Sequence, residues 1–185
     1  MTTGMILFIA AGFLLLWLIF AFNSLVKTRT RVQGAWADIE VQLERRHDLV
    51  PNLVEAVRGY MQHERSTLEA VTQARSVAVA SQGGDLAQRA DAEGALTSAV
   101  GNLLALSENY PRLRAVESVL TLEEQLTSTE NRIAFARQFY NDEAMKYNQM
   151  QSTFPRNLFA AMLGFHPAQM FEAAAAERAV QKVAI

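Results

Sequence analysis

Hydrophobic and polar positions follow two different patterns along this chain. Residues 5–22 form an unbroken apolar run, and the first charged side chain is Lys27. Beyond Lys27, apolar positions recur three and four residues apart, which is the spacing of one face of an α-helix rather than the alternation of a strand. The pattern predicts an all-α protein in which an N-terminal transmembrane helix is followed by an antiparallel bundle of long helices.

The apolar run has the length of a membrane span. At 1.5 Å per residue, Met5 to Val26 covers about 30 Å, the thickness of a bilayer's hydrocarbon core. A cleaved signal peptide would begin with basic residues and have a shorter run, and a core helix would include polar positions, so the sequence favours an anchor. No basic residue precedes the run, and the positive-inside rule therefore predicts an outside N-terminus and a cytoplasmic C-terminal domain. Five basic residues follow it closely: Lys27, Arg29, Arg31, Arg45 and Arg46.

The first amphipathic stripe crosses a proline. It keeps its phase through Pro51, and Arg46 takes one of its places, as Glu64 and Thr67 do further on. We therefore expect one kinked helix from about Lys27 to Ala80, while a break at Pro51 into two antiparallel helices is the alternative. The apolar members of the stripe are Trp36, Ile39, Leu43, Val50, Leu53, Val57, Tyr60, Val71, Ala74 and Ala78.

Turn signals divide the rest of the chain. Gly83 and Gly84 predict a loop before a second helix over 85–107 that is rich in small residues, and Asn109–Pro111 predicts the next connection. Further helices are expected over 113–151, from Pro155 to Met162, and over 168–183. This gives an anchor (1–26), a long-helix bundle (27–152), and short C-terminal helices with a tail (153–185).

Composition removes several classes of function. The net charge of −2 offers no electrostatic case for nucleic-acid binding, and the absence of cysteine excludes disulfides and thiol nucleophiles. His63-Glu64 lacks the second histidine of a zinc-protease helix, and Gly83-Gly84 lacks the Lys-Ser/Thr of a phosphate loop. We expect no catalytic residues, no metal, no cofactor and no enzymatic activity.

Polar residues on packing faces need partners, because burying them unpaired costs several kcal/mol. Arg46 lies on the first apolar stripe, and Glu130 and Arg137 lie beside the apolar stripe of the helix expected over 113–151. We therefore predict that Arg46 pairs with Glu130 across helices. A structural network is favoured over a ligand or catalytic site at these positions. The structural and interaction candidates are Trp36, Arg46, Asp48, Pro51, Asn52, Glu130, Asn131, Arg137, Tyr140, Asn141, Phe154, Pro155, Phe159 and Phe165.

The segment from Phe154 to Phe171 is unusually rich in large apolar side chains. It contains four phenylalanines, two methionines and two leucines in 18 residues. One interpretation is a core plug at the end of the bundle. The other is a surface for a partner, a second subunit or the membrane interface.

Several stretches of the chain carry a resemblance to a known family: Val32–Val54, Val71–Arg75, Glu108–Pro111, Thr129–Ile133, Phe139–Asn141 and Phe154–Leu158. Together they resemble the LemA family, and the resemblance covers roughly Asn23 to Phe171. It implies a bacterial membrane protein with a short N-terminal anchor and a helical-bundle domain, and it implies no catalytic residues. Some family members are associated with envelope functions or with membrane metalloproteases, so a membrane protease is one conceivable partner.

These observations favour a non-enzymatic scaffold or adaptor in the bacterial inner membrane. It would contact the bilayer and act by homo-oligomerisation or by binding protein partners, since tethering in one plane raises effective concentration. The alternative is a bundle with a polar ligand-binding or catalytic site built from Arg46, Asp48, Glu130 and Arg137.

Overall fold

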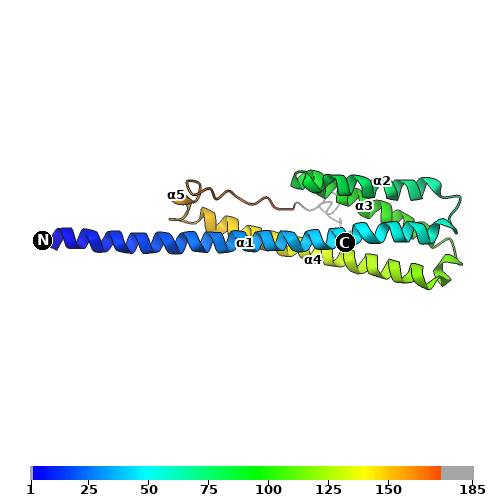
Figure 1. Ribbon diagram of the computed structural model, residues 1–185, viewed down its shortest axis with the longest axis horizontal. Coiled ribbons are helices and arrows are strands. Elements are labelled where there is room, and N and C mark those ends of the chain that lie inside the picture. The colour runs from blue at the N-terminus through cyan, green and yellow to red at the C-terminus, as the bar shows by residue number, and fades with distance from the viewer. Residues whose placement is uncertain (1, 172–185) are drawn as a thin grey trace, which may run out of the picture. The chain divides into compact units, whose positions relative to one another are not determined.

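The computed structural model describes residues 2–171, and over this range it contains helices and turns but no strand (Figure 1). The predicted all-α class is therefore confirmed. The elements in chain order are α1 (Thr2–Arg58), α2 (Arg65–Ala80), the 3-10 turn η1 (Ser81–Gly83), α3 (Leu86–Ser107), the 3-10 turn η2 (Leu113–Ala115), α4 (Glu117–Ser152) and α5 (Asn157–Ala160).

Helix α1 contains both the apolar run and the first amphipathic stripe. It is continuous through Pro51, whose side chain is exposed, so the alternative of a break at this proline is wrong. Its N-terminal part is long and apolar enough to cross a membrane. The expected kink at Pro51 stays a prediction.

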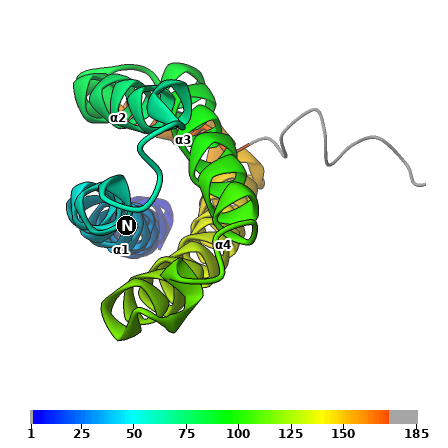
Figure 2. The same ribbon diagram turned by 90° about the vertical axis from the view of Figure 1, so that its right-hand side faces the viewer.

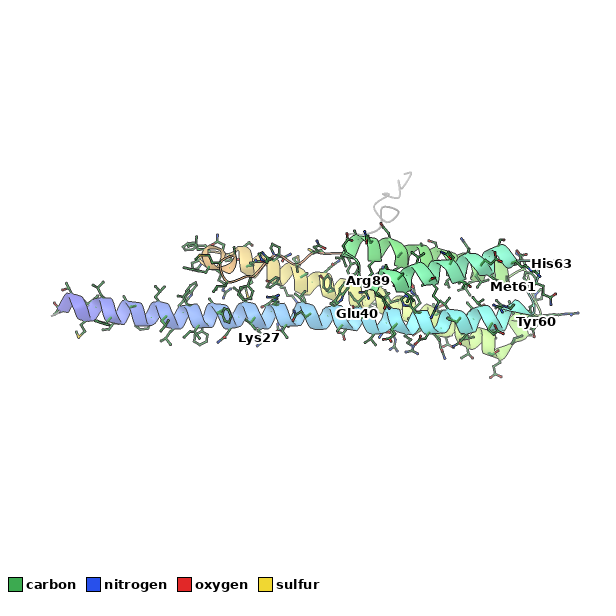
Figure 3. All side chains as sticks on the ribbon, turned by 45° about the horizontal axis from the view of Figure 1, so that its top comes forward. Lys27, Glu40, Tyr60, Met61, His63 and Arg89 are labelled. Atoms are coloured by element: carbon green, nitrogen blue, oxygen red, sulfur yellow. The ribbon has the colours of Figure 1, made fainter. Side chains whose placement is uncertain are left out.

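The predicted continuation of this helix to Ala80 is also wrong. Helix α1 ends at Arg58, and the chain turns over residues 59–64 before α2 begins. Gly59 weakens the helix there, and Glu64, one of the polar interruptions of the stripe, directly precedes α2. Tyr60, which we expected on the buried stripe, is 47 % exposed, whereas Met61 is fully buried (Figure 3).

The chain divides into two compact units. Among the described residues, the first unit comprises residues 2–38 and 138–170, and the second comprises residues 39–137 and 171. Both long helices, α1 and α4, contribute to each unit.

The second unit is a four-helix arrangement in which α2, α3 and α4 form an arc around the C-terminal part of α1 (Figure 2). Its core combines the predicted stripes with apolar positions of α2 and α3, so the stripe prediction holds for most of its members. The buried core residues are Val50, Leu53, Val54, Val57, Met61, Leu68, Val71, Ala78, Leu96, Val100, Leu103, Leu113, Val119 and Leu126.

The first unit packs the N-terminal part of α1 with the end of α4, with α5 and with the segment that follows α5. Trp36 and Tyr140 meet edge to face, with ring centroids 5.5 Å apart. Trp36 is half-buried and Tyr140 is buried. The other buried apolar residues of this unit are Ala21, Leu25, Val32, Ala35, Ala144, Tyr147, Ala160 and Phe165.

The remaining boundaries lie close to the predicted ones. Asp85 is the N-cap of α3, where its side chain accepts a hydrogen bond from the backbone N–H of Gln88 at 2.8 Å. Helix α4 starts four residues later than expected, because η2 precedes it, and α5 ends two residues before Met162. The helix predicted over 168–183 is wrong for residues 168–171, and its other residues lie outside the described range.

Met61 provides a test of the reversal after α1. Met61→Ala should destabilise the protein by about 2–5 kcal/mol, since it leaves a cavity under a fully buried side chain. Tyr60→Ala, its exposed neighbour, should cost about 0.5 kcal/mol. Guanidinium unfolding of the detergent-solubilised protein, followed by circular dichroism, measures both values. Equal losses of stability in the two variants would contradict the described turn of the chain over residues 59–64.

Candidate functional site

The polar centre of the second unit is the guanidinium of Arg46 on α1. Its Nη1 donates to the Thr97 hydroxyl of α3 at 2.8 Å and to Oε2 of Glu130 on α4 at 2.6 Å. Its Nη2 donates to the side-chain carboxylate and to the backbone carbonyl of Glu93 on α3. Arg46 is only 2 % exposed. The predicted pairing of Arg46 with Glu130 is confirmed, and Glu93 is a second, more deeply buried partner.

Glu93 connects Arg46 to the neighbouring residue His47. Nε2 of His47 lies 3.0 Å from Oε1 of Glu93, and because a carboxylate only accepts, the imidazole is the donor. Burial raises the pKa of Glu93, but the hydrogen bond from His47 and the positive charge of Arg46 outweigh it, so the net pKa lies below the usual 4.5. Glu93 is therefore a buried carboxylate at neutral pH, balanced by its two neighbours.

Further hydrogen bonds extend this network to α2 and to the start of α3. Nε of Arg75 donates to the backbone carbonyl of His47 at 2.6 Å. Arg89, which is buried, donates to Oε1 of Glu40 at 3.0 Å; Figure 3 shows these two side chains beside each other. Every helix of the second unit thus contributes to a polar contact with α1.

The structure does not assemble the predicted cluster of Arg46, Asp48, Glu130 and Arg137 as one site. Asp48 is exposed, and Arg137 places its guanidinium 5.4 Å from the centre of the Phe171 ring. Asn52 and Asn131 are exposed, as is Pro51.

Sequence reasoning missed Glu93, Thr97 and the role of His47. A signal for Glu93 was present, because positions 89, 93, 96, 100 and 103 are spaced three or four apart and form the buried face of α3. The abundance of small residues in this helix concealed that stripe.

A second polar arrangement lies in the first unit, where side chains of α4 hold the segment after α5. The amide of Asn148 donates to the Ala168 carbonyl at 2.9 Å and accepts from the Ala168 N–H at 2.8 Å. Gln151 donates to the Phe165 carbonyl, and the Tyr140 hydroxyl donates to the Gln169 carbonyl at 2.8 Å. These bonds replace the helix that we expected from Ala168. Burial raises the pKa of Tyr140, and its neighbour Asn141 is half-buried.

The aromatic segment lies against the apolar part of α1. The rings of Phe159 and Trp17 have centroids 6.4 Å apart, and those of Phe165 and Phe22 are 5.6 Å apart. Phe165 is buried and Phe159 is half-buried, whereas Phe154, which precedes Pro155, is exposed.

Within residues 2–171, no three His, Asp or Glu side chains are placed to hold a metal ion. An open groove between the end of α1 and α2 does not include the Arg46 network. Its lining residues are Val54, Arg58, Met61, Gln62, Arg65, Leu68, Glu69, Thr72 and Gln73.

Over residues 2–171, the fold and the polar network together define a class: an all-α protein with one helix able to cross a membrane and a bundle joined by buried ion pairs. The chain belongs to the LemA family, whose sequence model matches residues 35–185.

Three curated relatives are similar over most of the chain. Magnetosome protein MamQ 2 of Paramagnetospirillum magneticum is 26 % identical over 84 % of this chain and 66 % of its own length. Magnetosome protein MamQ of Magnetospirillum gryphiswaldense is 24 % identical over 83 % and 65 %, respectively. Protein LemA of Metamycoplasma hominis is 27 % identical over 84 % and 71 %. The chain thus spans about two thirds of the length of these relatives.

Removing the charge of Glu93 should destabilise the bundle strongly. Glu93→Gln leaves the buried Arg46 with one carboxylate fewer, and breaking such a pair costs about 3–5 kcal/mol. Glu130→Gln is the matched control: because the Glu130 side chain is 41 % exposed, its loss should cost about 1 kcal/mol. Chemical unfolding in detergent compares the two. Equal losses of unfolding free energy in the two variants would contradict the conclusion that Glu93 is the more deeply buried partner of Arg46.

The lowered pKa of Glu93 also predicts that the stability of the protein depends on pH. Because folding lowers the pKa of Glu93 below 4.5, its contribution is complete above about pH 4.5 and disappears as the pH falls through the folded value. The stability difference between the wild type and Glu93→Gln should therefore be constant near neutrality and shrink in acid. Unfolding curves of both proteins from pH 7 to pH 3 measure this. If the stability difference between the two proteins grew in acid, Glu93 could not be the ionised carboxylate described above.

Proposed function

We propose that this protein is a non-enzymatic scaffold of the bacterial inner membrane that acts by self-assembly or by binding protein partners. The N-terminal part of α1 is the anchor. Lys27, Arg29 and Arg31 directly follow the apolar run, and this basic cluster favours a cytoplasmic position for the rest of the chain.

The observation that carries this proposal is the mutual pairing of the buried charges in the polar network, although Nε of Arg46 and Nδ1 of His47 have no hydrogen-bond partner among residues 2–171. An active site needs a reactive group that a substrate can reach. Here the two Nη atoms of Arg46 donate to two carboxylates, a hydroxyl and a carbonyl, and Glu93 is only 1 % exposed. Such a network fits a role in fixing which helix faces pack together, a use of buried polar groups that is supported in other proteins.

Exposed apolar side chains on the helices favour association. Phe135 on α4 is 72 % exposed and Val41 on α1 is 59 % exposed, although both belong to helices with well-packed opposite faces. Covering such side chains on association removes apolar surface from water, at about 25 cal/mol per Å². Anchoring in one membrane plane raises the effective concentration of the copies and so reduces the affinity that each contact must supply.

The molecular mass of the full-length protein in detergent tests self-assembly. We expect a defined oligomer by light scattering, and we expect Phe135→Ser to lower its mass without changing the helical content, because the side chain lies on the surface. Glu124→Ser, an exposed polar position on the same helix, is the control and should leave the mass unchanged. A monomer at all concentrations would overturn self-assembly and leave binding of other proteins.

A ligand-binding or catalytic site around Arg46 and Glu130 is the second candidate. The observation that favours it is the partial exposure of the Glu130 carboxylate, through which the network reaches the surface. Loss of cellular function in Glu130→Gln, with a stability loss no larger than the expected value of about 1 kcal/mol and an unchanged oligomeric mass, would support this candidate over the scaffold.

A further inference from the structure

Residues 154–164, which contain α5, lie beside the part of α1 that we propose to cross the membrane. Phe159 contacts Trp17, and Phe165, directly after the segment, contacts Phe22. Trp17 and Phe22 both belong to the unbroken apolar run. A segment that packs on a membrane-spanning stretch shares its depth, so the contacts decide where residues 154–164 lie relative to a bilayer.

The outer side of this segment is strongly apolar. Met162 is 84 % exposed and Phe154 is 73 % exposed, and Leu158 and Leu163 are exposed beside them. The neighbouring surface of α1 is equally apolar and exposed, including Phe13 and Phe20. Two adjoining apolar surfaces of this kind are unfavourable in water but match the acyl chains of a lipid leaflet.

The backbone of the segment suits such an environment, in which unsatisfied N–H and C=O groups are costly. It ends in a tight cap: Gly164 has a φ of 76°, the Phe165 N–H donates to the Ala160 carbonyl at 3.0 Å, and the Gly164 N–H donates to the Ala161 carbonyl at 3.1 Å. Other N–H groups also find carbonyls within residues 153–160; the donors are Asn157, Leu158, Phe159, Ala160 and Leu163.

We propose that residues 154–164 are a second membrane-contacting element, inserted into the lipid leaflet on the side of the helical domain. This proposal rests on the membrane span of α1. Trp17 precedes Lys27 by ten residues, which places Phe159 about 15 Å along the helix axis from the first charged residue. Arg156 is half-buried, and its long side chain can extend its charge toward the headgroups. The Asn148, Gln151 and Tyr140 contacts then hold the chain leaving the bilayer against α4.

Site-specific fluorescence in vesicles tests the proposal. The chain contains no cysteine, so a single introduced cysteine gives one defined labelling position in the full-length protein. Met162→Cys and Leu158→Cys carry an environment-sensitive fluorophore in phosphatidylcholine vesicles with or without acyl-chain nitroxide lipids. Leu14→Cys, exposed within the apolar run, is the lipid control, and Phe135→Cys, exposed on α4, is the control outside the proposed element.

We expect the nitroxide lipids to quench the labels at positions 162, 158 and 14 strongly, and the label at position 135 weakly. If position 14 is quenched but positions 162 and 158 behave like position 135, the second element is refuted while the anchor stands. If position 14 is not quenched either, the membrane span itself is refuted. A blue-shifted label at position 162 that lipid nitroxides do not quench would show that a second copy covers the surface, which also overturns the proposal.

Discussion

The pairing of buried charges around Arg46 is the constraint on which the second unit depends. A guanidinium that is almost fully excluded from water must be surrounded by acceptors, and these come from two other helices. The apolar stripes alone would allow neighbouring helices to slide or rotate with modest changes in packing. The ion pairs allow far less freedom, because a shift of one residue would leave a buried charge without its partner.

The polar contacts inside the two units differ in their chemistry. In the second unit, charged groups join helix to helix through side chains. In the first unit, neutral groups of α4 bind the backbone of an irregular segment, as Asn148 does with both polar groups of Ala168. Neutral hydrogen bonds have a lower desolvation cost than ion pairs, which suits a region next to a stretch of helix without charged residues.

The sequence contained most of the fold but less of the network. Helical periodicity predicted the buried faces of α1 and α4, and Arg46 was recognisable because a charged residue on an apolar stripe needs a partner. The end of α1 at Arg58 was missed, since two half-stripes of similar phase resemble one long stripe across a short turn. Glu93 was missed because its helix is rich in small residues, and the hydrogen bonds of Tyr140 and Asn148 depend on tertiary contacts that no local pattern records.

The long sequence separation of the Arg46 contacts also has a consequence for synthesis. Glu93 and Glu130 follow Arg46 by 47 and 84 residues, respectively. During translation, the Arg46 side chain therefore stays hydrated until α3 has emerged, and its full set of partners exists only after much of α4 has been made. Until then, the nascent part of α1 that carries Arg46 lacks the partners that this charge needs in order to be buried.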